Sequence, residues 1–508
     1  MKKLATLALC FALLTSSAYA AEGEMGSFGG ISTGIKLETL TERGQAKKKT
    51  TSTKQTLPYK ENVYLSGKAE AVEGTIEIKP GKGMDKSVGS GSYSESYVMK
   101  AQNKDNTVRV SRTVTLETQY IYEPSRKQAT KTTTIKKWTE TVTVNGQTYT
   151  LDDDASNFTK SILEDYTPGV LYYRGDVHYT AVYTTGGGNE ASSVTVNVSA
   201  PIYGYEQALA KSETQKRTIT IDLGDGTGYV VEETPTFTVY RDIEYAANEP
   251  TAISMVGNYK ELIRSEGALS YNIIQGNNTL NEDEYSGMMS VEGNVSMNQL
   301  SYPTNLKLGG HPAETQIKKM YSMKIFDELT QPAATFSTNK VVTKKEYIKM
   351  LINMLQIELP EEKTSNKRSS SKKEEEVSPF IDLSPDDPYY RYAIAAYNTG
   401  LISGGRFNGN SYLTRELMYV LNVRAIGLER LGLGTMDAYT PFVDDNQIGA
   451  WAKSSIYAAS KLGIITPDNG YVFPKKNVTY AECATFLDQF MNYLRYDLQK
   501  DYNEKMLI

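Results

Sequence analysis

The chain has 508 residues, with 55 basic and 60 acidic side chains and a formal net charge of −5. That length allows several domains, and the mild acidity argues against a nucleic-acid partner, which requires a basic surface. The only cysteines are Cys10 and Cys483.

Residues 1–20 have the features of a secretory signal. Lys2 and Lys3 precede an apolar run, and Ala18-Tyr19-Ala20 is a small-x-small cleavage site. We expect export, after which 53 basic and 60 acidic side chains remain, a net charge of −7. No other apolar stretch approaches the ~20 residues that span a bilayer, so we expect no integral membrane segment.

Cleavage within this leader leaves one cysteine, Cys483, and this excludes a disulfide framework. Leu9 stands before Cys10, where a lipid-modification site requires a small residue, so we do not expect lipidation. We expect Cys483 to fill space in a helix core, because a nucleophilic thiol would need a neighbouring base.

The next two segments differ in pattern. Residues 21–58 are rich in Gly, Thr, Ser and Lys without periodicity, which predicts a flexible arm. Residues 59–302 alternate apolar and polar positions, as between Val108 and Tyr122, which is typical of strands with one buried face. Asn145-Gly146 predicts a tight hairpin that sets Val142 opposite Tyr149. We expect one or two antiparallel β domains, built as a meander or sandwich.

The β-rich region offers no catalytic motif. The sequence has no serine nucleophile elbow, no HExxH pair and no phosphate-binding glycine loop. The acidic runs 152–154 and 222–225 lack the spacing of a calcium loop and are interpreted as turn residues. A pair of carboxylates for glycoside hydrolysis stays open, since no pair stands out among many. We predict no catalytic residues, no metal site and no cofactor.

A pattern recurs in the last two fifths of the chain. Residues 379–421 contain Phe380-x-Asp382, an amphipathic helix, a glycine loop and Thr414-Arg415-Glu416 opening a second helix. Residues 441–490 repeat it with Phe442-x-Asp444, Phe473-Pro474 and Thr479-x-x-Glu482, and a fainter copy runs from Gly310 through Thr343-x-x-Glu346. Units repeated in this way stack to bury the apolar faces that each exposes alone.

These ordered motifs resemble the S-layer homology family. The resemblance, which covers this C-terminal part alone, implies an all-α pseudo-threefold bundle with grooves that hold secondary cell wall polysaccharide, often pyruvylated. Together with the β-rich region before it, we expect an α+β multidomain fold. Matching positions predict polysaccharide-binding residues in the second and third repeats: Asp382, Arg415, Ser403, Gly404, Asp444, Trp451 and Thr466. Lys344 and Tyr480 stand where the family has arginine, so we expect one competent groove, at most two.

The expected boundaries follow from these patterns. They are a signal (1–20), an arm (21–58), β-rich domain or domains (59–302), three repeats (303–360, 378–430 and 431–497), a charged disordered insertion (361–377) and a tail (498–508).

Three hypotheses remain open. The leading one is a non-enzymatic surface protein anchored to the wall, in an S-layer or similar structure, that displays a structural or adhesive β region. The second is a wall-anchored, polysaccharide-active enzyme. The third is a self-assembling surface-layer or appendage subunit with a purely structural bundle, in which Asp382 and Asp444 cap their repeats and Arg415 pairs with a neighbouring carboxylate.

Overall fold

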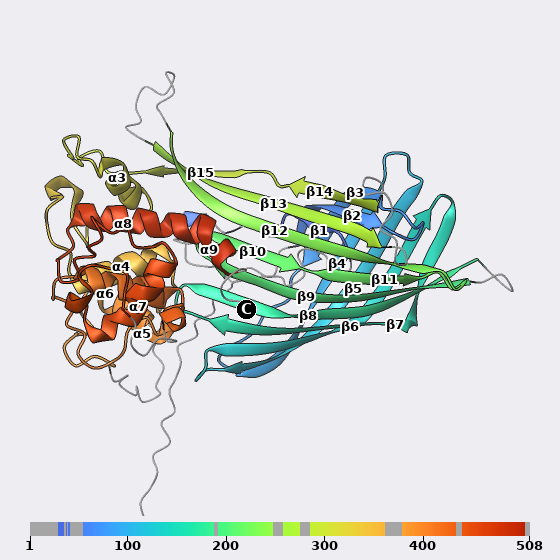
Figure 1. Ribbon diagram of the computed structural model, residues 1–508, viewed down its shortest axis with the longest axis horizontal. Coiled ribbons are helices and arrows are strands. Elements are labelled where there is room, and N and C mark those ends of the chain that lie inside the picture. Colours follow the sequence, from blue (N-terminus) through green and yellow to red (C-terminus); the bar gives the residue numbers. More distant parts are fainter. Residues whose placement is uncertain are drawn as a thin grey trace, which may run out of the picture.

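The computed structural model describes residues 29–34, 37, 39–40, 54–186, 192–246, 258–274, 285–360, 378–432 and 439–502. The expected signal and the charged insertion 361–377 lie outside these residues. A long curved sheet forms one end of the molecule, and a cluster of helices covers the other end (Figure 1).

The N-terminal half is antiparallel and β-rich. Its strands are β1 (Ile31–Ser32), β2 (Gln55–Val63), β3 (Glu70–Lys79), β4 (Ser90–Gln102), β5 (Val108–Glu123), β6 (Gln128–Val144), β7 (Gln147–Tyr166), β8 (Val170–Thr185), β9 (Ser192–Gln207), β10 (Ala210–Gln215), β11 (Arg217–Asp222), β12 (Gly228–Ala246), β13 (Asn258–Ile274), β14 (Ser286–Glu292) and β15 (Ser296–Ser301).

The sheet is a meander in which nearly every strand pairs with the next along the chain. The hairpin predicted at Asn145-Gly146 is confirmed, and Val142 lies opposite Tyr149. The alternation predicted for β5 is also confirmed, since Val108, Val110 and other inward residues are buried. The described strands form one 15-stranded sheet, so of the two expected arrangements the meander is confirmed and two separate packed sheets are not found among the described strands.

The sheet curls because several of its pairings are irregular. The register shifts between Thr115 and Leu116 of β5 and again within the β6–β7 and β7–β8 pairs. Bulges of this kind bend a strand and increase its twist. At Gly175 of β8 the strands approach so closely that an added Cβ would lie 1.8 Å from the carbonyl oxygen of Ser161. Curling lets a single sheet enclose its own core.

A short N-terminal segment lies against the inside of this curve. Residues 30–33 belong to the predicted flexible arm, yet they are buried, and Ile31 packs with Leu269 and Val291. The backbone amide of Leu40 donates to the carboxylate of Glu261, 3.1 Å away. β2 begins at Gln55, before the expected boundary at residue 59.

The C-terminal part is helical. Its helices are α3 (Glu314–Ser322), η2 (Ala333–Thr335), α4 (Lys344–Met354), α5 (Tyr390–Thr399), α6 (Arg415–Ala425), η3 (Glu429–Gly432), η4 (Asp445–Gln447), α7 (Ala450–Lys461), α8 (Tyr480–Asn492), η5 (Tyr493–Asp497) and α9 (Leu498–Asp501). Gly400 ends α5 with φ 80°, a left-handed conformation that glycine adopts without strain. Capping boxes start α4 at Thr343 and α8 at Thr479.

Three extended segments, which precede α4, α6 and α8, are joined in a ring. The amide of Val342 donates to the carbonyl of Val478, Val478 donates to Leu413, and Leu413 donates to Val342, each over 2.9 Å. The residues that open the three helices form a second cyclic set in the opposite direction, in which the amide of Lys344 donates to Ser411, that of Arg415 to Lys476 and that of Tyr480 to Lys340. The three helix starts are therefore related by a cyclic set of backbone hydrogen bonds.

The sheet and the helices share one core. Val170, Tyr172 and Leu209 of the sheet region belong to the same buried cluster as residues of α3 to α9. The hydroxyl of Tyr172 donates to the carbonyl of Ile426 over 3.0 Å, and the side-chain amide of Gln207 donates to the carbonyl of Leu494 over 2.8 Å. The two halves are thus packed together rather than joined by a linker.

No helix in the described part of the chain is long and apolar enough to cross a membrane.

Candidate functional site

Asp382 and Asp444 occupy equivalent places. The carboxylate of Asp382 accepts the backbone amides of Phe407 and Asn408 at 2.6 and 2.8 Å, and Asp444 accepts those of Val472 and Phe473 at 3.0 and 2.8 Å. The amides of Asn408 and Phe407 lower the pKa of Asp382. Both aspartates therefore hold the loop that leads into the second helix of their unit. Their carboxylates bond to this loop rather than capping the start of their repeats, which was the role expected in a purely structural bundle.

The remaining predicted residues differ in accessibility. Asp444 is 2% exposed, whereas Trp451, at the start of α7, is 57% exposed. Ser403 and Gly404 are exposed in the loop that pairs with Phe380, and Thr466 is exposed in the corresponding loop of the last unit. Trp451 is the one aromatic residue in the predicted set, and its ring is accessible.

Arg415 lies in the seam between α6, α8 and the loop before α8. Its guanidinium stands 5.8 Å from the ring centre of Phe473 and 5.4 Å from that of Phe486, and it donates to Glu482 over 2.9 Å. The hypothesis of a purely structural bundle expected Arg415 to pair with a neighbouring carboxylate, and it does so with Glu482. The Nε of Arg415 is buried and makes no hydrogen bond within the described residues.

Glu482 combines several bonds. Burial alone would raise the pKa of its carboxyl, but bonds from Lys476, the backbone of Thr479 and Arg415 outweigh burial and lower the pKa to about 2. Glu482 is therefore an anion over the whole physiological range, and it fixes both Arg415 and the start of α8.

The positions equivalent to Arg415 carry other side chains. Lys344 donates its Nζ to the carbonyl of Phe407 over 2.7 Å, and burial lowers its pKa. Tyr480 is buried and donates its hydroxyl to the carbonyl of Thr330 over 2.8 Å. Both side chains thus donate to backbone carbonyls.

The predicted residues lie in two different seams. Asp382 lies near Lys344. Asp444 and Arg415 lie on either side of Phe473 in the other seam.

Further residues of the Arg415 seam were not predicted. Tyr471 and Phe473 stack with ring centres 5.5 Å apart and are 37% and 39% exposed. Glu416 accepts Lys475 Nζ at 2.6 Å and the amide of Gly449 at 3.0 Å, which ties the turn before Trp451 to α6. The Phe473-Pro474 motif indicated this loop in the sequence, but the stacking and accessibility of the Tyr471 and Phe473 rings are seen only in the structure.

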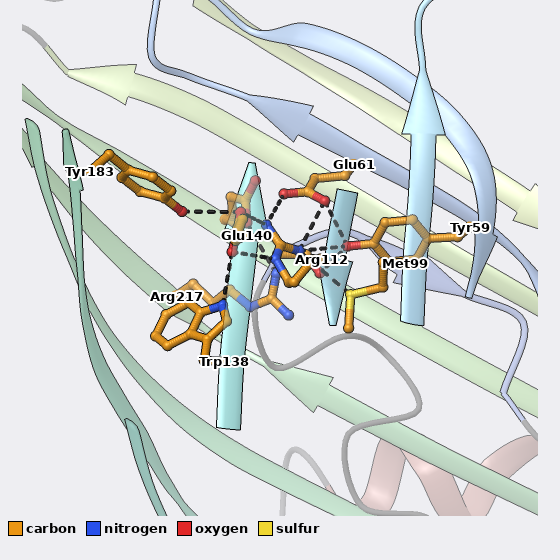
Figure 2. A network of polar contacts seen from close by, with 10 residues as sticks. Tyr59, Glu61, Met99, Arg112, Trp138, Glu140, Tyr183 and Arg217 are labelled. Atoms are coloured by element: carbon orange, nitrogen blue, oxygen red, sulfur yellow. Dashed lines mark hydrogen bonds and ion pairs between the residues drawn. The ribbon is translucent and has the colours of Figure 1, made fainter. Parts of the chain in front are cut away.

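A buried polar network inside the curved sheet is a second candidate site (Figure 2). Arg112 of β5 donates to Glu61 over 2.9 Å and to Glu140 over 2.6 Å. Glu140 also accepts Trp138 Nε1 at 3.0 Å and the hydroxyl of Tyr183 at 3.1 Å. The periodicity of β5 placed position 112 on the inner face, but no sequence signal identified its partners on β2 and β6.

This network places two carboxylates on either side of one guanidinium. Hydrolysis of a glycosidic bond needs a pair of carboxyl groups that reaches the substrate. Here Arg112, Glu61 and Glu140 are 3%, 5% and 4% exposed, and both carboxylates are occupied by hydrogen bonds. The arrangement is that of a satisfied internal ion network rather than an accessible catalytic pair.

The acidic runs in the β region have local structural roles. Asp222 and Asp225 accept the amides of Gly224 and Thr227, each at 2.9 Å, as predicted for turn residues. Residues 152–154 lie within β7 at a bulge rather than in a turn, so that interpretation is wrong. Their carboxylates cluster within 4.8 Å, and most are exposed.

Cys483 has the predicted packing role. It is fully buried in α8, 3.6 Å from the sulfur of Met350, and burial raises the pKa of its thiol. A buried, protonated thiol is unreactive.

Comparison with known proteins identifies a family for the part of the chain that contains Trp451. Residues 441–484 match the S-layer homology domain. A domain of this kind implies association with the cell surface or cell wall. The match includes Asp444, Trp451, Thr466 and the loop that carries Phe473.

Curated relatives share a limited part of this chain. An amylopullulanase of Thermoanaerobacterium thermosulfurigenes is 30% identical over 178 residues, which are 34% of this chain and 9% of the relative. Exoglucanase XynX of Acetivibrio thermocellus is 30% identical over 178 residues, 15% of its length, and an endoglucanase of Bacillus sp. (strain KSM-635) is 27% identical over 179 residues, 17% of its length. The chain therefore spans less than a fifth of these relatives.

Proposed function

We propose that this chain is an exported surface protein that three S-layer homology repeats hold noncovalently to secondary cell wall polysaccharide. The observation that carries the proposal is the family match at residues 441–484. The ring of hydrogen bonds between Val342, Leu413 and Val478 supports extending it to three repeats, because each segment occupies the same place relative to the next. The β-rich half would then be what the protein displays.

The seam around Arg415 is the proposed polysaccharide site. Trp451 offers an exposed ring for a sugar face, and Tyr471 and Phe473 add a second stacked surface. Arg415 supplies a positively charged guanidinium beside these rings, and its side chain is 13% exposed, which suits contact with a carboxylate such as that of a pyruvyl ketal. Asp382, Ser403 and Gly404 belong to the next seam, where Lys344 replaces arginine, so we assign that seam a weaker contribution.

A cosedimentation experiment tests the proposal. The mature chain is incubated with purified cell wall, and with wall chemically stripped of its polysaccharide. We expect retention on the first and not on the second, and Trp451→Ala should lower retention several-fold. Ile121→Ala is the matched control, since Ile121 is 61% exposed but lies on β5 of the sheet. Equal retention on both walls would remove the anchoring proposal.

Self-assembly is a second candidate, supported by the last strand of the sheet. β15 pairs only with β13 among the described strands, and it exposes Met297 (66%). Open edges with apolar side chains favour pairing between copies. Light scattering should then show association that grows with concentration and is suppressed by Met297→Lys. A monomer at all concentrations would exclude it.

A further inference from the structure

A hollow on the outer face of the sheet crosses β6, β7, β8 and β9 and has a volume of about 690 Å³. Two rows of outward side chains line it. In one row, Leu163 of β7 lies opposite Arg174 of β8, which lies opposite Tyr203 of β9. In the other, Ser161 lies opposite Asp176, which lies opposite Pro201. Because residues two apart on a strand are separated by about 7 Å, the rows form a track across four strands.

The charge of this track is positive. Arg174 and Lys216 both line it and are exposed, and within the described residues neither forms an ion pair. Lys216 is held beside the track because its amide donates to the carbonyl of Pro201 over 3.0 Å. Lys131 also lines the hollow, but it is buried and pairs with Glu164. Asp176 is the single carboxylate among the described lining residues. The two exposed cations against one anion favour a negatively charged ligand.

The rest of the lining is suited to sugar rings. Tyr203 is half-buried and stands 6.5 Å, between ring centres, from Tyr502 of the C-terminal helix, which limits its movement. Pro201, two residues from Tyr203 on β9, and Leu163, on the far side of Arg174, add apolar surface, and Ser161 offers a hydroxyl. A flat ring, a hydroxyl and two exposed cations together match a polyhydroxylated ligand that carries carboxylates.

We propose that this track binds an acidic oligosaccharide, and that it is a site separate from the helical seams. The carboxylates of the sugar pair with Arg174 and Lys216, and a pyranose face packs on Tyr203. We propose binding rather than cleavage, because hydrolysis uses a pair of carboxyl groups and the described lining supplies one, Asp176. The proposal does not depend on the function assigned to the helices, since the lining residues in the described part of the chain all belong to the sheet region.

Calorimetric titration of the full mature chain with trigalacturonic acid tests the proposal, with maltotriose as the neutral probe. We expect saturable binding of the acidic trisaccharide that weakens with added salt, and at least tenfold weaker binding of maltotriose. The double variant Arg174→Gln/Lys216→Gln should lower affinity for trigalacturonic acid at least tenfold. Arg109→Gln/Lys137→Gln, which removes two exposed cations of β5 and β6 outside the track, should leave it unchanged.

The seam variant Trp451→Ala separates this site from the wall-binding site. It should lose cosedimentation with cell wall and keep its affinity for trigalacturonic acid. The proposal is overturned by absence of binding to the wild-type chain, by equal affinity for the two trisaccharides, by unchanged affinity of the Arg174/Lys216 variant, or by loss of binding in Trp451→Ala. Unchanged circular dichroism and melting temperature of each variant establish that it is folded.

Discussion

Removal of the guanidinium at Arg112 should destabilise the sheet severely. The side chain is 3% exposed and donates to two carboxylates, Glu61 and Glu140, that are themselves buried. Arg112→Met would leave both carboxylates without their counter-charge, and breaking a buried pair in this way costs about 3–5 kcal/mol. Urea denaturation of the protein measures this loss in the free energy of unfolding. In a Trp451→Phe background the remaining tryptophan, Trp138, reports from within the network.

Two variants make this measurement specific. Arg109→Met changes an exposed arginine on the same strand and should alter the free energy of unfolding by less than about 0.5 kcal/mol. The triple variant Glu61→Gln/Arg112→Met/Glu140→Gln removes all three charges and should recover most of the loss, because neutral groups avoid the penalty of buried charge. A loss below about 1 kcal/mol for Arg112→Met, or no recovery in the triple variant, would refute the reasoning.

Two further predictions concern the helical part. Asp444→Ala leaves two backbone amides unsatisfied at a buried site, so it should lower the free energy of unfolding by about 1–3 kcal/mol in urea denaturation. Asp382→Ala, at an exposed position, should lower it by less. Equal losses for the two variants would contradict the role of burial. Since the pKa of Glu482 is held at about 2, below its ordinary value, its bonds stabilise the fold above that ordinary value and lose their effect as the pH falls toward 2. The melting temperature should therefore fall below pH 4.5, more gently in Glu482→Gln, and parallel profiles for the two proteins would disprove this.

Much of the β-rich half could be predicted from local pattern. Alternation along β5 and the Asn145-Gly146 turn are short-range signals, and both the buried face and the Val142–Tyr149 register were confirmed. Closure of the strands into one curled sheet depends on bulges and on the close approach at Gly175, which no short window of sequence specifies. In the network around Arg112, Glu61 lies 51 residues away along the chain and Glu140 lies 28 residues away, opposite Arg112 on β6, and no local pattern pointed to either partner.

The predicted seam residues show a similar limit. Motif spacing placed Asp382 and Asp444 at equivalent points, and the structure gives both the same bonds to backbone amides. Spacing did not reveal that these bonds occupy the carboxylates, nor that Arg415 would pair with Glu482. The C-terminal tail carried no recognisable motif, yet Tyr502 packs on Tyr172 of β8 with ring centres 5.2 Å apart.

Tryptophan fluorescence tests the central claim most directly. In a Trp138→Phe background, Trp451 is the only tryptophan, and it lies exposed beside the proposed polysaccharide site. Titration with purified, soluble wall polysaccharide should produce a saturable change in its emission and protect it from iodide quenching, and Arg415→Ala should weaken both effects. Cosedimentation with cell wall and no change in the emission or quenching of Trp451 would contradict the account.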